Sequence, residues 1–209
     1  MKNEIISPAP VTNKTLQIIY ERRAVRKYKK VSVDKGLIER IIDAGRMAPS
    51  AINQQVWEFY VLTDRELITA LGKEIVAVSM KGFVKSGIRN IVRTASHLIH
   101  FPHGFNFHSL EDPVFHGAPA VIFITGPKDN EWAHLDIGMC AQNMMLAAKS
   151  LGLDTCPIGF AKYVGETKLY PKLNVPVTEE VVLAVILGYG DEHPVLHERK
   201  TQNIFFINQ

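Results

Sequence analysis

The sequence lacks several features that mark whole classes of protein. Only two cysteines, Cys140 and Cys156, occur among its 209 residues, and both stand in apolar segments. This count excludes a disulfide framework and favours a reducing compartment, so we expect a cytoplasmic protein. No apolar run approaches the roughly 20 residues that span a bilayer. The N-terminus has no continuous apolar signal segment, so no membrane partner is expected.

Strong charge and glycine-rich phosphate loops are also missing. The formal net charge is only +3, and the basic residues are scattered except for a cluster at residues 22–30. No basic stripe interleaved with aromatic residues results, so a nucleic-acid partner is not expected. Neither GxGxxG nor GxxxxGK occurs, which excludes the phosphate loops of those motifs. The basic cluster therefore indicates a small anion as its partner.

The pattern of apolar residues predicts an α+β protein, which we expect to form a single domain over residues 1–209. No internal repeat, low-complexity tract or linker interrupts the chain. Helices are expected from Thr12 into the arginine cluster, from Asp34 to Pro49, from Asp64 through the eighties, and over residues 136–151. Buried strands are expected at 57–62, 118–125 and 180–188, a short final strand at 203–207, and an extended turn at 155–160.

The helix expected at residues 136–151 is the most apolar of the four. Gly152 follows it where a left-handed C-cap belongs. A helix that is apolar on all sides is buried on more than one side. In a chain of 209 residues, this pattern predicts an interface between two subunits.

Three arginines stand within five residues, at Arg22, Arg23 and Arg26. Their mutual repulsion is costly unless an anion lies between them. If the first helix runs through this cluster, Arg22 and Arg26 share a face and can bind one phosphate together. A solvated helix end stabilised by Glu21 is the simpler alternative.

Small and polar residues join the second helix to the first strand, in the run APSAINQQVW at residues 48–57. The small residues permit close approach of the backbone, while Ser50, Asn53 and Gln55 offer hydroxyl and amide groups. Such a mixture suits a ligand that carries both hydrogen-bond donors and acceptors. A polar connection that caps its own helix is the alternative.

The segment 87–117 is rich in histidine and phenylalanine and is expected to be a mobile cover over a site. Its histidines have the spacing HxxHxxHxxxxH, at His97, His100, His103 and His108. No carboxylate or cysteine accompanies them, and Pro102 breaks any helix that would align them, so no metal site is expected. They line a substrate pocket, or they belong to a partly buried surface loop.

Taken in this order and spacing, these segments resemble the nitroreductase family of FMN-binding enzymes. The matching segments are ERRAVRKY, APSAINQQVW, FHGAPAVIFITG, DIGMCAQNMMLAAKSLGLDTCPIGF and HERKTQNIFFI, and the resemblance covers about residues 14–207. It implies a three-layer α/β/α sandwich with a mostly antiparallel central sheet. It also implies a homodimer with flavin at the interface, in which each C-terminal arm is exchanged with the partner subunit.

The activity that this resemblance implies is electron transfer from NAD(P)H through FMN by a ping-pong mechanism. Nitroaromatics, quinones or similar small electrophiles would accept the electrons. The flavin performs the redox step, so no protein nucleophile or catalytic acid is expected. A flavin-binding or flavin-handling protein of the same fold without NAD(P)H turnover is the alternative. A regulatory module that binds a small anion would leave segments 48–57 and 155–160 unexplained.

The resemblance also assigns residues to parts of the flavin. Arg22 and Arg23 look like ligands of the FMN phosphate, together with Arg199 and Lys200 from the C-terminal arm. Arg26 stands where the family places a cation near the pyrimidine side of the ring. Residues that would approach the flavin of the other subunit are Ser50, Ala51, Ile52, Asn53 and Gln55.

Pro157, Ile158 and Gly159 would carry their backbone past flavin N5. Asn90 and Arg93 are further candidates on the ring side. The chain departs from the family pattern in two places. Ala24 replaces a serine that contacts the phosphate end, and Val56 replaces a proline before Trp57.

Overall fold

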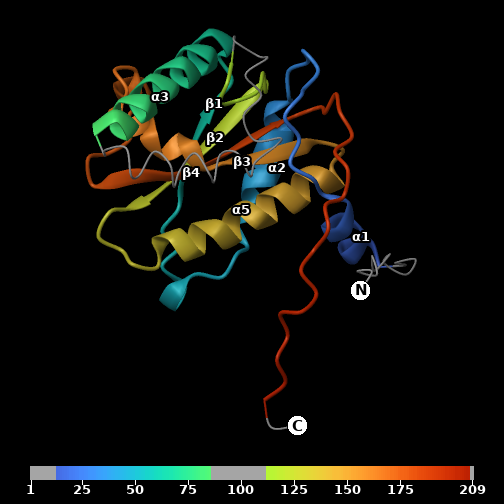
Figure 1. Cartoon of the computed structure of the whole chain (residues 1–209). Helices are drawn as coiled ribbons and strands as arrows, with labels where there is room; N and C mark the ends of the chain where they lie inside the picture. The colour runs from blue at the N-terminus through green and yellow to red at the C-terminus, as the bar shows by residue number, and fades with distance from the viewer. Residues whose placement is uncertain (1–12, 86–111, 208–209) are drawn as a thin grey trace.

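A four-stranded antiparallel sheet forms the centre of the molecule (Figure 1). In this computed structural model, the structure describes residues 13–85 and 112–207. The strands are β1 (Glu58–Leu62), β2 (Ala120–Pro127), β3 (Asp154–Ile158) and β4 (Glu179–Gly188), and they lie in the order β1-β2-β4-β3. Each neighbouring pair is antiparallel. The prediction of an α+β fold with a mostly antiparallel sheet is confirmed.

Helices cover both faces of the sheet, which confirms the three-layer arrangement. On one face lie α2 (Lys35–Arg46) and α5 (Ala133–Ser150), and on the other lie α3 (Arg65–Lys85) and the 3-10 helix η2 (Gly159–Glu166). The remaining helical segments are α1 (Lys14–Glu21), η1 (Ala51–Asn53) and η3 (Tyr170–Leu173).

The alternation of side chains along β2 divides the apolar core in two. Val121 and Phe123 join the cluster under α3, whereas Ile122 and Ile124 join the cluster under α2 and α5. All four side chains are 0% exposed. Successive residues of a strand point to opposite faces, so one β-branched run supplies both cores. Each fully buried side chain of this size stabilises the fold by about 1.5–3 kcal/mol.

The helix ends follow the capping residues in the sequence. Asp34 accepts a hydrogen bond from the Leu37 amide at 3.2 Å, and Asp64 accepts one from the Leu67 amide at 3.0 Å. Gly152 has a φ of +78°, the left-handed conformation expected after α5. Asn13 caps α1 through the amides of Thr15 and Leu16, whereas Thr12, the predicted cap, lies outside the described residues.

Close packing of α2 on α5 depends on Gly45. A Cβ atom there would lie 2.6 Å from Cγ of Met144 and 3.0 Å from Sγ of Cys140. The absence of a side chain at Gly45 leaves room for these two side chains of α5 against the backbone of α2. This contact places the end of α2 beside the middle of α5, and the connection that follows reaches the first turn of α5 at Asp136.

Three predicted elements differ in the structure. The strand β1 is only partly buried, because it lies at the sheet edge with β2 as its one paired neighbour. Residues 155–160 are not a simple turn, because β3 pairs with β4 as far as Ile158. Residues 203–207 form no strand and are exposed. Among the helices that the structure describes, none is long and apolar enough to cross a membrane.

Candidate functional site

The arginine cluster lies on extended chain rather than on a helix. The helix α1 ends at Glu21, and Arg22 has a φ of −58° and a ψ of 128°. The prediction that Arg22 and Arg26 share a helical face is therefore wrong. Ala24 instead forms a parallel bridge with Thr155, and the Val25 amide donates to the Thr155 carbonyl at 3.0 Å. Tertiary pairing with β3 outweighs the helical pattern of this segment.

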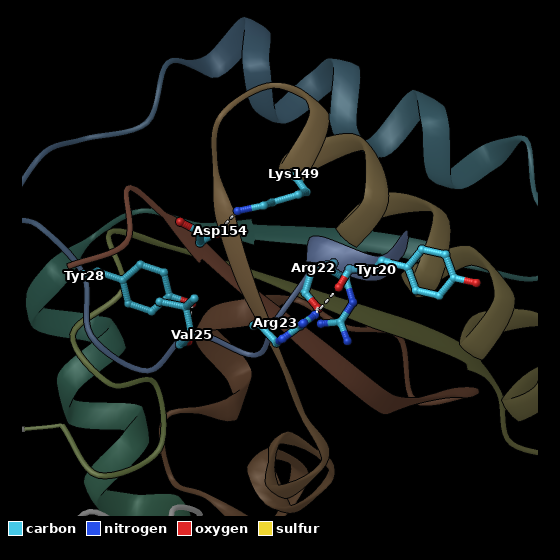
Figure 2. Close-up of polar contacts among 7 residues, drawn as sticks. All are labelled: Tyr20, Arg22, Arg23, Val25, Tyr28, Lys149 and Asp154. Atoms are coloured by element: carbon cyan, nitrogen blue, oxygen red, sulfur yellow. Dashed lines mark hydrogen bonds and ion pairs between the residues drawn. The ribbon is translucent and has the colours of Figure 1, made fainter. Parts of the chain in front are cut away.

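Arg22 carries a buried nitrogen that lacks a partner. Its Nη1 atom is buried and has no hydrogen-bond partner among the described residues. Burial lowers the pKa of Arg22, and the charges of Arg23 and Arg199 lower it further. Figure 2 shows the guanidinium groups of Arg22 and Arg23 close to the end of α1. A buried N–H donor among like charges is costly unless an acceptor, best an anion, completes it.

Arg23 has acceptors within the chain. Its Nη1 donates to the carbonyl oxygen of Arg22 at 2.8 Å and to that of Tyr20, as the dashed lines in Figure 2 show. The carbonyl groups at a helix C-terminus lack helical partners, so Arg23 completes the end of α1. The charge of Arg23 remains beside Arg22, but Nη1 of Arg23 already donates to two backbone carbonyl groups.

The C-terminal arm returns to the beginning of the chain. It runs past α1 in Figure 1, and the charge of Arg199 is near enough to lower the pKa of Arg22. Nη1 of Arg199 donates to the His197 carbonyl at 2.8 Å, and both Arg199 and Lys200 are exposed. Arg22 and Arg199 therefore gather at one place although they stand near opposite ends of the sequence.

The root of this arm is paired with the arginine segment. The Lys29 amide donates to the Tyr189 carbonyl at 2.8 Å, and the Asp191 amide donates to the Lys27 carbonyl at 2.9 Å. The Arg26 amide donates to Oε1 of Glu192. Residues 189–192 thus hold the chain that carries Arg26, and they set the direction in which the arm leaves.

Arg26 interacts with two groups that sequence reasoning did not single out: its amide donates to Glu192, and its charge acts on His116. Burial lowers the pKa of His116 to about 4, and the charge of Arg26 contributes to this shift. His116 is therefore neutral at pH 7, and it sits in a turn with a φ of 54°. The sequence does not reveal the interaction of His116 with Arg26, because the two residues stand far apart along the chain.

Cys156 is a buried thiol on which the charges of Arg22 and Arg26 act. Burial raises its pKa, while the charges of Arg26 and Arg22 act in the opposite direction. Cys156 is 1% exposed, as expected for a small buried apolar residue. The charges of both arginines therefore act on the middle of β3, where Ala24 pairs with Thr155.

Pro157 and Ile158 end β3 beside this cluster, and Gly159 begins η2. Pro157 and Gly159 are exposed, whereas Ile158 is buried. β3 is an edge strand of the sheet, which permits a proline there. A Cβ atom on Gly159 would have no other atom within 4 Å. The backbone at Gly159 therefore borders open space.

The second predicted part of the site lies elsewhere in the chain. The segment 50–55 contains three non-glycine residues with positive φ, at Ile52 (46°), Asn53 (58°) and Gln55 (49°). The Gln55 amide donates to Oγ of Ser50 at 2.9 Å, and the Ala51 amide donates to the carboxylate of Asp136. Backbone strain of this kind concentrates at functional sites.

An open groove of about 680 Å³ borders this segment. Its lining combines the segment 49–54 with the chain that starts α5, including the exposed side chains of Trp132 and Leu135. Asp129, Asn130 and Glu131 add polar groups to this lining. The groove therefore combines apolar and polar side chains, which suits an organic ligand or a protein segment.

The two parts of the predicted site are separated within one chain. The segment 50–55 contacts the first turn of α5 through Asp136, whereas Arg22 lies near Thr155, beyond the other end of α5. A helix of 18 residues is about 27 Å long at 1.5 Å per residue. The structure thus brings Arg22, Arg23, Arg26 and Arg199 together with the end of β3, but not with residues 50–55.

Some predicted residues cannot be placed. Asn90, Arg93 and the four histidines at 97–108 lie outside the described residues, as does nearly all of the proposed cover at 87–117. Within residues 13–85 and 112–207, no group of three histidine, cysteine or acidic side chains is arranged to hold a metal ion.

The chain is similar to several known proteins over most of its length. A model of the nitroreductase family matches residues 19–189. A 4-nitrobenzoate reductase of Pseudomonas putida is 28% identical over 86% of this chain and 87% of its own length. An NADPH-flavin oxidoreductase of Vibrio harveyi is 25% identical over 92% of this chain and 76% of its own. A nitroreductase with bound FMN from Bacteroides fragilis superposes with a TM-score of 0.73 and 27% identity, over 94% of this chain and all of that one.

Proposed function

Because the chain belongs to the nitroreductase family, we propose that it is an FMN-dependent oxidoreductase that takes electrons from NAD(P)H. The proposed acceptors are nitroaromatics, quinones or similar small electrophiles. Support comes from the relatives named as a nitrobenzoate reductase and an NADPH-flavin oxidoreductase, and from the FMN held by the similar structure. FMN, once bound, would supply the redox chemistry, with hydride uptake from the nicotinamide and electron transfer to the acceptor.

The observation that carries this proposal is the unpaired Nη1 of Arg22. It is buried and faces no acceptor among the described residues, and the charge of Arg199 stands beside it. A phosphate monoester offers several oxygens and about two negative charges, which fit two guanidinium groups. Arg22 and Arg199 would bind the phosphate, Lys200 would add charge, and Arg23 would contribute charge while completing α1.

The ring would lie along the end of β3. Pro157 and Gly159 are exposed there, and a Cβ atom on Gly159 would have no other atom within 4 Å, which suits close approach of a planar ligand. Arg26 would face the pyrimidine side, where a fixed cation stabilises the negative charge that the ring gains on reduction. NAD(P)H and the acceptor would occupy the same space in turn, so the kinetics would be ping-pong.

A homodimer would complete the site. Residues 50–55 are too remote to reach a ligand on Arg22 of their own chain, so they would approach the flavin of the partner subunit. The C-terminal arm has large apolar side chains that the described chain leaves 70–84% exposed, at Ile204, Phe205, Phe206 and Ile207. Such a row needs cover. We infer that it packs on the partner as an exchanged arm.

The proposal is tested with the FMN-saturated protein under anaerobic conditions. NADH and NADPH are added separately, and the flavin absorbance is followed in a stopped-flow instrument. Bleaching by one or both nucleotides, reversed by a nitroaromatic or quinone, is the expected result. A yellow protein that neither nucleotide bleaches would instead be a flavin-binding protein without reductase turnover. A protein that binds no FMN at saturating concentration would refute both functions.

A further inference from the structure

Asp136 is a charged side chain buried in the first turn of α5. It is 1% exposed, and its two carboxylate oxygens lie 3.2 and 3.1 Å from the backbone nitrogen of Ala51. No basic side chain among the described residues forms an ion pair with it. The helix N-terminus stabilises the negative charge, but burial of an unpaired carboxylate still carries a cost. Because Asp136 costs stability at this position, we look for a function that its contact with Ala51 serves.

The chain that Asp136 holds has a strained backbone. Three of the five non-glycine residues with positive φ in the described chain lie within residues 52–55. Ile52 is β-branched, for which a φ of 46° is unfavourable, and its side chain is 89% exposed. Packing of the Ile52 side chain therefore does not enforce this conformation. Hydrogen bonds hold the segment instead, and the contact from Ala51 to Asp136 joins its start to α5, as the contact from Asn130 to Gln54 does further along.

We propose that Asp136 is a positioning residue of the flavin site. By accepting the Ala51 N–H, it fixes residues 50–55 in the conformation in which they meet the flavin of the partner subunit. A segment ordered before binding loses less conformational entropy when the ligand arrives. The contact with flavin rests on the proposed function, whereas the fixing of the segment by Asp136 does not.

The hydrogen bond can be broken from either side. Asp136→Ala removes the acceptor, and Asp136→Asn keeps one oxygen for the Ala51 N–H. Ala51→Pro removes the donor. Proline suits this position, because Ala51 begins η1 and Ser50 before it has a φ of −139° and a ψ of 154°. Glu131→Ala is the matched control, since Glu131 lines the same groove and makes no described contact with the segment.

Two readouts are measured on the full-length protein. In the apoprotein, hydrogen exchange at the Ala51 amide should be at least roughly tenfold faster in Asp136→Ala than in the wild-type protein. The Kd of FMN should rise about tenfold in Asp136→Ala and in Ala51→Pro, but less than about threefold in Asp136→Asn and Glu131→Ala.

A general loss of stability is separated from positioning by the double variant. Asp136→Ala and Ala51→Pro break the same hydrogen bond, so together they should raise the Kd no more than either does alone. Two effects that multiply would show that Asp136 acts on the fold rather than through Ala51, and would overturn the proposal. Wild-type exchange at Ala51 in Asp136→Ala would overturn it as well.

The outcome for FMN is read separately. If the wild-type protein binds no FMN, the proposed function fails, and the exchange rate of Ala51 still shows whether Asp136 fixes the segment. If the wild-type protein binds FMN and Asp136→Ala binds it equally well, the proposed function stands and the positioning role is refuted.

Discussion

Burial lowers the pKa of Arg22, near the N-terminus, and the charge of Arg199, near the C-terminus, adds to this shift. This relationship requires the arm after β4 to return past α1, and the pairing of residues 189–192 with residues 26–29 gives it that direction. Like charges gathered beside a buried, unpaired N–H raise the free energy of the empty site. Binding of a dianion removes this cost, which is the physical basis of the proposed phosphate site.

Ala24→Ser should strengthen FMN binding. A serine hydroxyl at this position, in the segment that carries the arginines, would add one hydrogen bond to the phosphate. One such bond contributes about 0.5–1.5 kcal/mol, or roughly a threefold to tenfold lower Kd. Titration of the apoprotein with FMN measures it, and Ala77→Ser on the exposed face of α3 is the control. An unchanged Kd would place residue 24 away from the phosphate.

Gly45→Ala should destabilise the fold. The new methyl group would meet Met144 at 2.6 Å, and overpacking of this kind costs about 1–3 kcal/mol. Urea denaturation of the variant gives the free energy of unfolding. Arg40→Ala on the exposed side of α2 is the control and should change it by less than about 0.5 kcal/mol. Equal stability of Gly45→Ala and the wild type would contradict the described α2–α5 contact.

His116 should make the protein less stable as the pH falls. Its folded-state pKa of about 4 lies below the value of 6.5 that it has in the unfolded chain. Between these values the unfolded chain binds the extra proton, so the free energy of unfolding decreases from pH 6.5 towards pH 4 and is unaffected by this group at higher pH.

The substitution His116→Asn tests this dependence, because asparagine tolerates the φ of 54°. Between pH 7 and pH 5, the variant should lose about 1–2 kcal/mol less free energy of unfolding than the wild type. Urea denaturation at both pH values is the measurement. Parallel losses in the two proteins would show that His116 is not held neutral.

Arg26→Gln should lower the midpoint potential of bound FMN. Removal of a fixed cation beside the ring weakens the reduced state by about 1–2 kcal/mol, which is roughly 20–40 mV for a two-electron couple. Lys27→Gln is the matched control, because its ammonium group pairs with Asp191 at 2.8 Å on the surface. Equal midpoint potentials in the two variants would show that Arg26 does not lie beside the flavin ring.

The sequence predicts best those parts of the fold that local chemistry determines. Asp34, Asp64 and Gly152 locate helix ends because caps act over a few residues, and the β-branched run at β2 determines a strand buried on both faces. The arginine segment was predicted wrongly as helix. Its extended form depends on pairing with Thr155 and Gly190, which no local pattern reveals.

The candidate site shows the same division. A cluster of arginines is visible in the sequence, so its anion-binding role was predicted from the residues and the family resemblance. The return of Arg199 to Arg22 followed only from the resemblance, because it depends on the path of a long arm. Asp136, Glu192 and His116 were missed, since each acts through a contact with a residue far away along the chain.

The central claim is that Arg22 and Arg199 together bind the phosphate of FMN, and it is tested by comparing FMN with riboflavin. Riboflavin lacks the phosphate, so the wild-type apoprotein should bind FMN at least about a hundredfold more tightly. In the double variant Arg22→Ala, Arg199→Ala this preference should fall to less than about tenfold. Lys168→Ala, at an exposed lysine, should keep it. A double variant that retains the full preference for FMN would contradict the account.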